Sequence, residues 1–584
     1  MPQNSTENFK SGSEILLEGI IQHGENGKNT IWGYPGGSVI PLYDTMLRYQ
    51  DSIQHILVRH EQGAAFAAAG SARASGKVGV CLATSGPGAT NLITGVADAM
   101  MDSIPMVVIT GQVFSPFLGT DAFQEVDAIG CFLPIVKHSY QVTDAHDMAR
   151  VISEAFFLAS TGRPGPVHID ITKNAFIQKV EFSGFSVPEI SGYKTNYSPE
   201  ISQIEKAVQL IQEAKKPIII VGHGTLLARA QKEALELIEY ADIPCVQTLL
   251  GLSAVPTSHP KTLGMLGMHG QKYANNAVDQ ADLIISLGAR FDDRITGIIS
   301  EFERNTKFIH FDIDSAEIGK NVRCDAPVVG DLKESLPKIL EILKKNTENS
   351  GTTPEFFQKK HADWDAQIAD WKAEFSVTKV HACHGEKCEK KLRAWDVLEK
   401  ISEQNGGDCH VISDVGQHQM WIAQGFPVVR PNTHHHSGGA GTMGFSLPTA
   451  MGVQHACPQD EVWSISGDGG FQMNSQEMMT IVQENLPVKI AILNNSFLGM
   501  VRQWQELFES GYSYVNITAP DFVKLGEAYG IPSFRAETPQ EAEEMIKKAR
   551  AINGPTLIEF KTIKEENVFP MVPQGKGLGA TRIQ

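Results

Sequence analysis

Short, uniformly apolar segments recur along this chain, each followed by a glycine-rich turn and then by apolar residues at helical spacing. The segment VGVCLA (78–83) precedes the turn SGPGATN, a helical stretch and a second apolar segment, PMVVITG (105–111). Strands that are apolar on both faces and are joined by helices are typical of parallel sheets covered on each side. The pattern therefore predicts an α/β fold.

Interruptions in this pattern divide the 584 residues into three α/β units. A stretch punctuated by Pro, Ser and Gly at 182–200 is typical of a linker, and the charged segment 346–394, poor in β-branched residues, predicts a helical or extended connector. The spacing of Ser11 and Glu14 is that of a capping box, which places the first helix near residue 11. The expected domains are 11–181, 198–345 and 395–565, followed by a carboxy-terminal tail at 566–584.

The composition excludes several classes of function. Acidic residues outnumber basic ones by 67 to 50, a net charge of −17, and no run of Lys or Arg forms a patch for nucleic acid or anionic lipid. The eight cysteines include no C-x-x-C pair, which favours a reducing compartment. The amino terminus lacks the layout of a signal peptide, and no apolar run approaches the ~18 residues that span a bilayer. We therefore expect a cytoplasmic protein without nucleic-acid or membrane partners.

The sharpest functional signal is a Gly-Asp-Gly sequence followed 27 residues later by two asparagines. Asp468 follows the apolar segment 462–466, and Asn495 follows the apolar segment 487–493. Because a βαβ crossover brings both strand ends to the same sheet edge, we expect these two side chains to lie close together. Carboxylate and amide oxygens suit Mg²⁺, which keeps positions for a diphosphate, and the neighbouring glycines let the backbone approach phosphates. The spacing of Asn474 and Glu477 predicts a capping box for the next helix.

A lone Gly-Asp-Gly is more often a surface turn, but the paired motif at two strand ends is more specific and resembles the diphosphate motif of thiamine-diphosphate enzymes. Over residues 11–345 and 395–573 the chain is similar to the catalytic large subunits of acetohydroxyacid synthase, also called acetolactate synthase. The resemblance implies a pyrimidine-binding domain, a nucleotide-binding-like middle domain that holds FAD, and a diphosphate-binding domain like the first. The implied magnesium ligands are Asp468, Asn495 and the main-chain carbonyl of Phe497. The implied thiamine-diphosphate contacts nearby are Val415, Gly416, Gln417, His418, Gly441, Met443, Gly469 and Gly470.

Glu61 stands where an apolar segment gives way to a helix rich in Ala and Gly. An isolated Glu there is explained more simply by the helix dipole. The resemblance instead implies that Glu61 protonates the aminopyrimidine of the cofactor, a step that generates its ylid. Residues of two glycine-containing loops, together with Gln124, are implied on the pyrimidine and substrate side of the pocket. They are Tyr34, Pro35, Gly37, Pro87, Asn91 and Gln124.

The middle domain carries several glycine-rich segments, but none completes G-x-G-x-x-G. From the residues alone they indicate only a nucleotide pocket, which is a weak signal. The resemblance implies that the nucleotide is FAD, whose flavin makes no net redox step in the main reaction. The implied contacts are Arg163, Gly222, Gly224, Gly267, Met268, His269, Gly288, Arg290, Asp292, Asp312, Ile313 and Asp331.

A 2-ketoacid substrate requires a cation for its carboxylate, and a guanidinium can hold it with two hydrogen bonds. The resemblance implies Arg294 for this role and Trp504 as the contact of the ethyl group of 2-ketobutyrate, although a tryptophan here could equally belong to the core. The further implied pocket or channel residues are Phe123, Gln124, Lys137 and Met268.

The implied reaction is decarboxylation of pyruvate and transfer of the hydroxyethyl group to pyruvate or 2-ketobutyrate, in the synthesis of valine, leucine and isoleucine. The family forms its active sites between two subunits. A homodimer or homotetramer and a small regulatory subunit are therefore implied as partners.

Two unusual segments invite a metal-site interpretation. Adjacent side chains diverge in most backbone conformations, so for His434–His436 a solvated loop is the better prediction. The cluster of His381, Cys383, His384 and Cys388 lies in a charged segment without a second ligand pair, which favours exposed linker over zinc.

Rival functions have less support. No Walker A sequence, H-E-x-x-H or G-x-S-x-G occurs. The nearest alternatives are another thiamine-diphosphate enzyme, such as a 2-ketoacid decarboxylase, oxalyl-CoA decarboxylase or the FAD-independent catabolic acetolactate synthase. A catalytically silent cofactor-binding subunit is a further alternative, which the presence of Glu61 disfavours.

Overall fold

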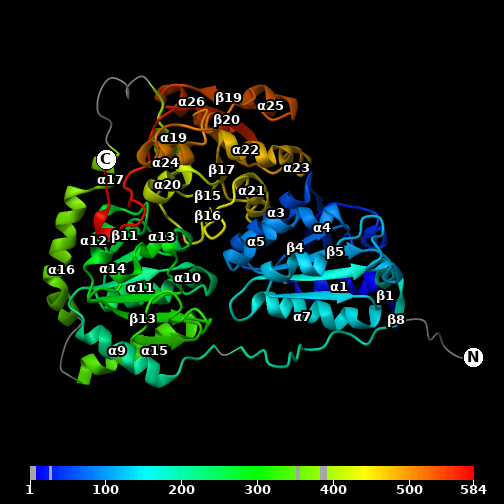
Figure 1. Ribbon diagram of the computed structural model, residues 1–584, viewed down its shortest axis with the longest axis horizontal. Helices are drawn as coiled ribbons and strands as arrows, with labels where there is room; N and C mark the ends of the chain where they lie inside the picture. Colours follow the sequence, from blue (N-terminus) through cyan, green and yellow to red (C-terminus); the bar gives the residue numbers. More distant parts are fainter. Residues whose placement is uncertain (1–7, 25–28, 196, 350–354, 382–390, 584) are drawn as a thin grey trace, which may run out of the picture.

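Three six-stranded sheets follow one another along the chain in the computed structural model, which describes residues 8–24, 29–195, 197–349, 355–381 and 391–583. All strands within these sheets run parallel, and helices cover both faces (Figure 1). The predicted α/β fold class is therefore confirmed. Within the described ranges, every helix is too short or too polar to traverse a lipid bilayer.

The first sheet has the strand order β3-β2-β4-β5-β7-β6. Ser11 opens its first helix with the predicted capping box, since the Ser11 main-chain N–H donates to the Glu14 carboxylate at 2.8 Å. The strands are β2 (Asn29–Gly33), β3 (Ile53–Leu57), β4 (Gly79–Ala83), β5 (Met106–Gln112), β6 (His138–Val142) and β7 (Pro166–Thr172), with the antiparallel pair β1 (Phe9–Ser11) and β8 (Lys179–Glu181) beside them. The helices are α1 (Gly12–His23), α2 (Ile40–Met46), α3 (Glu61–Ser75), α4 (Pro87–Asn91), α5 (Ile93–Met101), α6 (Ala128–Phe132), α7 (Met148–Ser160) and α8 (Lys173–Ile177).

The second sheet has the strand order β11-β10-β9-β12-β13-β14. Its central strands, β9 and β12, are wholly buried, as the apolar sequence PIIIV predicts. The strands are β9 (Pro217–Val221), β10 (Cys245–Gln247), β11 (Thr262–Met265), β12 (Leu283–Leu287), β13 (Lys307–Asp312) and β14 (Ala326–Val329). The helices are α9 (Ile201–Glu213), α10 (His223–Leu227), α11 (Gln231–Tyr240), α12 (Lys272–Asp279), α13 (Asp293–Thr296), α14 (Ile299–Phe302) and α15 (Leu332–Asn349).

The third sheet has the strand order β16-β15-β17-β18-β20-β19. The predicted capping box at Asn474 is wrong, because Asn474 ends a helix and its amide donates to the Gly444 carbonyl at 2.7 Å. The strands are β15 (His410–Ser413), β16 (His434–His436), β17 (Val462–Gly467), β18 (Lys489–Asn494), β19 (Ser533–Ala536) and β20 (Thr556–Lys561). The helices are α19 (Ala394–Asn405), α20 (Gln417–Gly425), α21 (Ser446–Ala456), α22 (Asp468–Asn474), α23 (Met478–Gln483), α24 (Gly499–Phe508), α25 (Phe522–Ala528) and α26 (Pro539–Ala551).

The prediction of a solvated loop at His434–His436 is wrong. These residues form β16, which pairs in parallel with β15, and all three side chains are buried. Burial lowers the pKa of each imidazole, so the three rings are neutral and can lie inside the fold. Consecutive strand residues point to opposite sheet faces, which is why three adjacent histidines do not converge on one metal ion.

The connector and the tail both pack on the middle domain. Helix α16 (Glu355–Glu374) runs along its outer side (Figure 1), where the Trp364 indole N–H donates to the Pro217 carbonyl at 3.1 Å. Val572 and Leu578 of the tail are buried in the same core. The short helix α17 (Val377–Val380) precedes His381, whose ring stacks on Trp395. Cys383, His384 and Cys388 lie outside the described residues.

Helices α3 and α21 join the first and third domains by an unusually close crossing (Figure 1). A methyl group added to Gly70 would lie 2.3 Å from the Thr449 carbonyl oxygen, and one added to Gly452 would lie 2.0 Å from the Ala67 carbonyl oxygen. Glycine is therefore required at both positions for the two helix backbones to approach. The crossing sets the position of Glu61, at the start of α3.

Candidate functional site

The carboxyl ends of β17 and β18 bring the predicted magnesium ligands to one sheet edge. Gly467 pairs with Leu493, so Asp468 and Asn495 leave neighbouring strands close together. The Asp468 carboxylate is 1% exposed, and its Oδ2 atom has no hydrogen-bond partner among the described residues. Burial raises the pKa of Asp468 to about 6, opposed in part by main-chain N–H groups that include that of Ser496. A buried carboxylate oxygen without a hydrogen-bond partner can bind a cation, so this donor set fits Mg²⁺.

The loop after β18 is ordered by its own amides. The Phe497 main-chain N–H donates to Asn495 Oδ1 at 3.0 Å, which fixes the Asn495 side chain. Asn495 Nδ2 lies 3.5 Å from Gln417 Oε1, so Gln417 of α20 reaches the same place. Ser496 has a positive φ of 60°, the turn that reverses the chain after the strand. The predicted ligands Asp468, Asn495 and Phe497 are thus gathered at one end of the sheet.

Glycines make a shallow cradle around the start of α22. A methyl group on Gly469 would lie 2.9 Å from Leu498 Cδ2 and 3.5 Å from Met443 Cε. A methyl group on Gly470 would lie 2.6 Å from Asp414 Oδ1. The two glycines therefore let Leu498 and Asp414 pack closely against the start of α22. The first-turn N–H groups of a helix can bind an anion.

Asp414 is a structural residue of this cradle that the sequence analysis missed. It is buried, and its carboxylate accepts hydrogen bonds from the main chain of Val415, Gly444 and Ser446 at 2.8 to 3.2 Å. Burial raises the pKa of Asp414 to about 6. An acid directly after the apolar strand HVIS was the available signal, because a carboxylate at a strand end orders the loops around it.

A cavity of about 810 Å³ lies where the three domains meet. Its wall combines loops of the middle domain with residues of α20 and α24 and with the segment after β16. It brings together sixteen predicted site residues: Arg163, Gly224, Met268, His269, Gly288, Arg290, Asp292, Arg294, Asp312, Ile313, Asp331, Val415, Gly416, Gly441, Met443 and Trp504.

Two glycines that were predicted to contact FAD, Gly222 and Gly267, do not line the cavity but lie next to residues that do. A methyl group on Gly222 would lie 2.2 Å from the Gly288 carbonyl oxygen, and one on Gly267, whose φ is +105°, would lie 2.5 Å from the Arg294 carbonyl oxygen. Both glycines let neighbouring loops of the middle domain touch, which shapes the cavity indirectly.

Charged groups line the part of the cavity formed by the middle domain. Burial raises the pKa of Asp312 to about 6. Arg163 comes from the first domain, donates to Glu317 at 2.8 Å and lies 3.6 Å from Asp314, so it ties the two domains together. The acids at strand ends here are suited to hydroxyl donors such as those of a nucleotide ribose.

Glu61 lies in a second group of predicted site residues, all of which belong to the first domain. It is the first residue of α3, is buried, and accepts a hydrogen bond from Asn91 Nδ2 at 3.0 Å. Pro87 opens α4 beside it, and a methyl group on Gly88 would lie 3.4 Å from Glu61 Oε1. A methyl group on Gly86 would lie 2.8 Å from the carbonyl oxygen of Gln124, so the Gln124 loop adjoins this group.

The loop Tyr34–Gly37 belongs to the same sheet edge. The Tyr34 main-chain N–H donates to the Leu82 carbonyl at 3.2 Å, and Gly36 packs against Thr84. Pro35 and Gly37 therefore lie beside the strand that leads to Pro87. None of the residues of the Glu61 group lines the cavity described above.

Two predicted pocket residues lie elsewhere. Phe123 is 89% exposed, and Lys137 donates to the main-chain carbonyls of Leu158 and Thr161, the latter at 2.8 Å. Burial lowers the pKa of Lys137 to about 8. The structure therefore does not bring these side chains to the cavity, whereas Arg294 and Trp504 line it, with Arg294 Nη1 3.5 Å from the Met268 sulfur.

A buried carboxyl beside Glu61 was also missed. Glu477 accepts the Arg59 main-chain N–H at 3.0 Å and the Thr480 hydroxyl at 2.7 Å, and a methyl group on Gly63 would lie 2.6 Å from it. Burial raises the pKa of Glu477 to about 7. The third domain thus places an acid against the first turn of α3.

Comparison with known proteins gives matches over all three domains. Three family descriptions match: the N-terminal TPP binding domain of thiamine pyrophosphate enzymes at residues 11–131, their central domain at 204–339, and their C-terminal TPP binding domain at 414–560. The acetolactate synthase large subunit of Mycobacterium tuberculosis is 45% identical over 97% of this chain and 90% of its own length. Its counterpart in Cyanidium caldarium is 44% identical over 98% and 97%, and that of Corynebacterium glutamicum is 44% identical over 94% and 87%. With identity of this extent, and with an acid and an asparagine meeting at the sheet edge, the chain belongs to the acetolactate synthase large-subunit family of thiamine pyrophosphate enzymes.

Proposed function

We propose that this protein decarboxylates pyruvate and transfers the resulting two-carbon unit to pyruvate or 2-ketobutyrate. The observation that carries the proposal is the buried Asp468 carboxylate, whose Oδ2 atom has no partner among the described residues, at the same sheet edge as Asn495 in a chain of this family. Asp468, Asn495 and the Phe497 carbonyl would hold Mg²⁺ against the diphosphate, while Gly469 and Gly470 leave room for it. When bound, thiamine diphosphate supplies the electron sink for decarboxylation and carbon–carbon bond formation.

Glu61 would hold a proton at the pyrimidine ring. Its carboxylate is buried at the start of α3 and is oriented by Asn91, which keeps one oxygen engaged at 3.0 Å. A carboxyl in a confined position can donate its proton to a ring nitrogen and take it back. The neighbouring loops with Pro35, Gly37 and Pro87 would exclude water around the ring.

Arg294 and Trp504 would select the second substrate. Both line the cavity. The Arg294 side chain is 65% exposed and lies 3.5 Å from the exposed Asp293 carboxylate, so its guanidinium remains accessible to a substrate carboxylate. The indole of Trp504 packs against Phe508 with ring centroids 5.0 Å apart, which presents a flat apolar surface to a short alkyl group.

The middle domain would hold FAD, because its acids and glycine-rich strand ends line most of the cavity. The flavin would be a resident group that adds no net redox step to this reaction. A small regulatory subunit would bind the chain as well, since the relatives are named large subunits.

Product analysis tests the reaction. Purified protein with pyruvate, Mg²⁺ and thiamine diphosphate should form acetolactate, and added 2-ketobutyrate should yield the aceto-hydroxybutyrate product. Acetaldehyde as the only product would overturn the transfer reaction. Glu61→Gln should lower turnover by about 10²-fold or more, as expected for a general acid–base group. The matched control Glu334→Gln, at the first turn of α15, should retain full turnover.

We propose further that active sites form between two chains, because none of the residues of the Glu61 group lines the cavity that Arg294 and Trp504 line in the same chain. Co-expressed Glu61→Gln and Asp468→Asn chains test this arrangement. Between-chain sites predict that one site of each mixed dimer is intact, which restores about a quarter of wild-type activity. Sites within one chain would leave every site defective, so the absence of restoration in isolated mixed dimers would contradict the proposal.

A further inference from the structure

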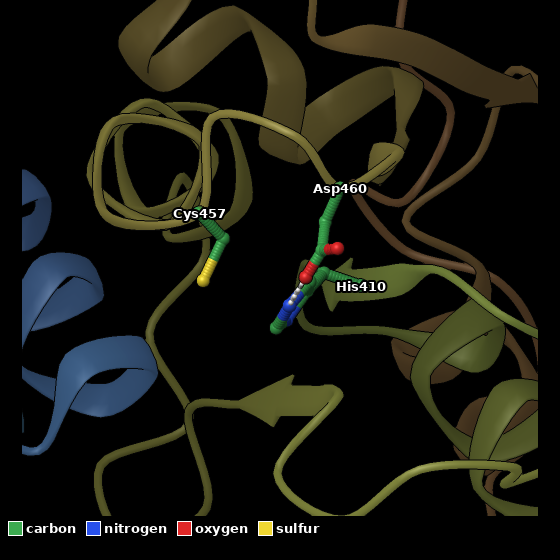
Figure 2. Close-up of side chains that lie close together, drawn as sticks. All are labelled: His410, Cys457 and Asp460. Atoms are coloured by element: carbon green, nitrogen blue, oxygen red, sulfur yellow. Dashed lines mark hydrogen bonds and ion pairs between the residues drawn. The ribbon is translucent and has the colours of Figure 1, made fainter.

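A histidine, a cysteine and an aspartate converge at the edge of the third domain, outside the proposed active site. His410 begins β15, Cys457 follows the last residue of α21, and Asp460 lies two residues before β17. One ligand atom from each side chain lies within 4.8 Å of the other two (Figure 2). None of the three lines the central cavity, and the proposed reaction uses none of them.

The backbone holds these three residues in place without a metal ion. The His410 main-chain N–H donates to the Glu461 carbonyl at 2.9 Å, which joins β15 to the start of β17. The turn between Cys457 and Asp460 is closed by an N–H···O bond of 3.2 Å, and the Gln454 amide donates to both residues' carbonyls at 3.2 and 3.1 Å. The ligand atoms are therefore preorganised by secondary structure.

Each ring nitrogen of His410 contacts another polar side chain. His410 Nδ1 lies 3.1 Å from Nε2 of the buried His435, and the two rings are stacked with an interplanar angle of 11°. His410 Nε2 forms a hydrogen bond with Asp460 Oδ2 at 3.0 Å. A metal ion bound at Nε2 would replace the proton of this hydrogen bond and leave the ring proton on Nδ1, where His435 Nε2 can accept it. A second residue that fixes the tautomer in this way is a regular feature of histidine metal sites.

The charged side chains around these three residues are also compatible with a bound cation. Arg430 Nη1 lies 3.2 Å from Asp460 Oδ2, and the Arg430 side chain also pairs with Asp408. Two acids thus surround one guanidinium. A thiolate at Cys457 would add a further negative charge, so a divalent ion would find a nearly balanced site.

We propose that His410, Cys457 and Asp460 bind a zinc ion, with water as the fourth ligand. Imidazole nitrogen, thiolate and carboxylate are ligands that Zn²⁺ takes in tetrahedral geometry, with ligand atoms ~3.3–3.8 Å apart. The present separations need to change by only a few tenths of an ångström up to about one ångström to reach that geometry. A thiolate disfavours Mg²⁺, so the site is distinct in chemistry from that at Asp468. Binding releases the Cys457 thiol proton and links β15, α21 and β17.

Cobalt substitution tests the site directly. Full-length protein, stripped with chelator and then saturated with Mg²⁺ and thiamine diphosphate, is titrated with Co²⁺ alone. A thiolate-to-cobalt charge-transfer band and tetrahedral d–d bands should grow to one equivalent, and Cys457→Ser should abolish the charge-transfer band. The matched control Cys324→Ser changes another half-buried free cysteine and should keep the full spectrum. An unchanged spectrum in Cys457→Ser, or no tetrahedral band in the wild type, would overturn the proposal.

Alkylation of the wild-type protein gives a second test that needs no variant. Zinc alone should slow the modification of Cys457 by a maleimide at least tenfold, as mapped by mass spectrometry, while the rate at Cys324 stays constant. Equal protection of both cysteines would indicate general tightening of the fold, and no protection of Cys457 at saturating zinc would contradict coordination. Either result would contradict the zinc site and would leave the proposed reaction unaffected.

Discussion

Among single residues, Glu477 gives the clearest prediction of how the stability of the protein depends on pH. Its pKa is raised by burial to about 7, above the ordinary value of 4.5, so folding favours the protonated form. The protonated Glu477 side chain therefore contributes to the free energy of unfolding below pH 4.5, and this contribution is lost as the pH rises through about 7. Glu477→Gln keeps an acceptor for the Arg59 N–H and cannot ionise. We expect the free energy of unfolding of this variant to fall less between pH 4.5 and 7 than that of the wild type, as measured by urea denaturation.

A control variant shows whether the change in pH dependence is specific to Glu477. Glu541→Gln alters an exposed acid that caps α26 and should leave the pH slope unchanged. A slope in Glu477→Gln as steep as in the wild type would mean that Glu477 is already ionised in the folded protein at these pH values.

At the residue scale, the sequence motif predicted where two of the proposed metal ligands lie in the fold. Asp468 and Asn495 follow neighbouring strands, as their spacing predicts. The surroundings were not predictable in the same way, because Asp414 and Glu477 owe their role to contacts with main-chain groups far along the chain. A single acid in the sequence carries no sign of which N–H group will approach it.

At the scale of elements, the crossing of α3 and α21 depends on two glycines. Gly452→Ala places a methyl group 2.0 Å from the Ala67 carbonyl oxygen, so the helices must separate. We expect a loss of about 1–3 kcal/mol in the free energy of unfolding, typical of overpacking, and reduced activity because α3 carries Glu61. Gly511→Ala, which enters open space, should change stability by less than about 0.5 kcal/mol. Equal stability of the two variants would contradict a close crossing.

Elements were predicted best where periodicity and length agreed. The apolar strands of all three sheets follow from sequence alone, because burial on both faces leaves a uniform pattern. The three-residue strand of histidines escaped prediction, since polar side chains gave no sign of burial. It is stabilised by pairing with β15 and by neutral imidazoles, which are tertiary effects.

At the scale of the whole molecule, the cavity depends on the contact between the first and middle domains and on the loops of the middle domain. Gly288→Ala forces a side chain onto a residue with a φ of +65° and places a methyl group 2.6 Å from Gly224 Cα. We expect this variant to lose bound flavin, measured by absorbance after gel filtration, while keeping a folded circular dichroism spectrum. The control Gly511→Ala should retain the flavin. Full flavin content in Gly288→Ala would argue against FAD in this cavity.

The central claim is that Asp468 and Asn495 bind a divalent ion that anchors the cofactor diphosphate. Calorimetric titration of thiamine diphosphate into metal-free protein, with and without Mg²⁺, tests it most directly, using the wild type and Asp468→Asn. We predict that Mg²⁺ strengthens wild-type binding by at least about tenfold, equivalent to ~1.4 kcal/mol, and leaves Asp468→Asn binding weak. Equal affinity of the wild type and Asp468→Asn for thiamine diphosphate, or an affinity that does not depend on Mg²⁺, would contradict this claim.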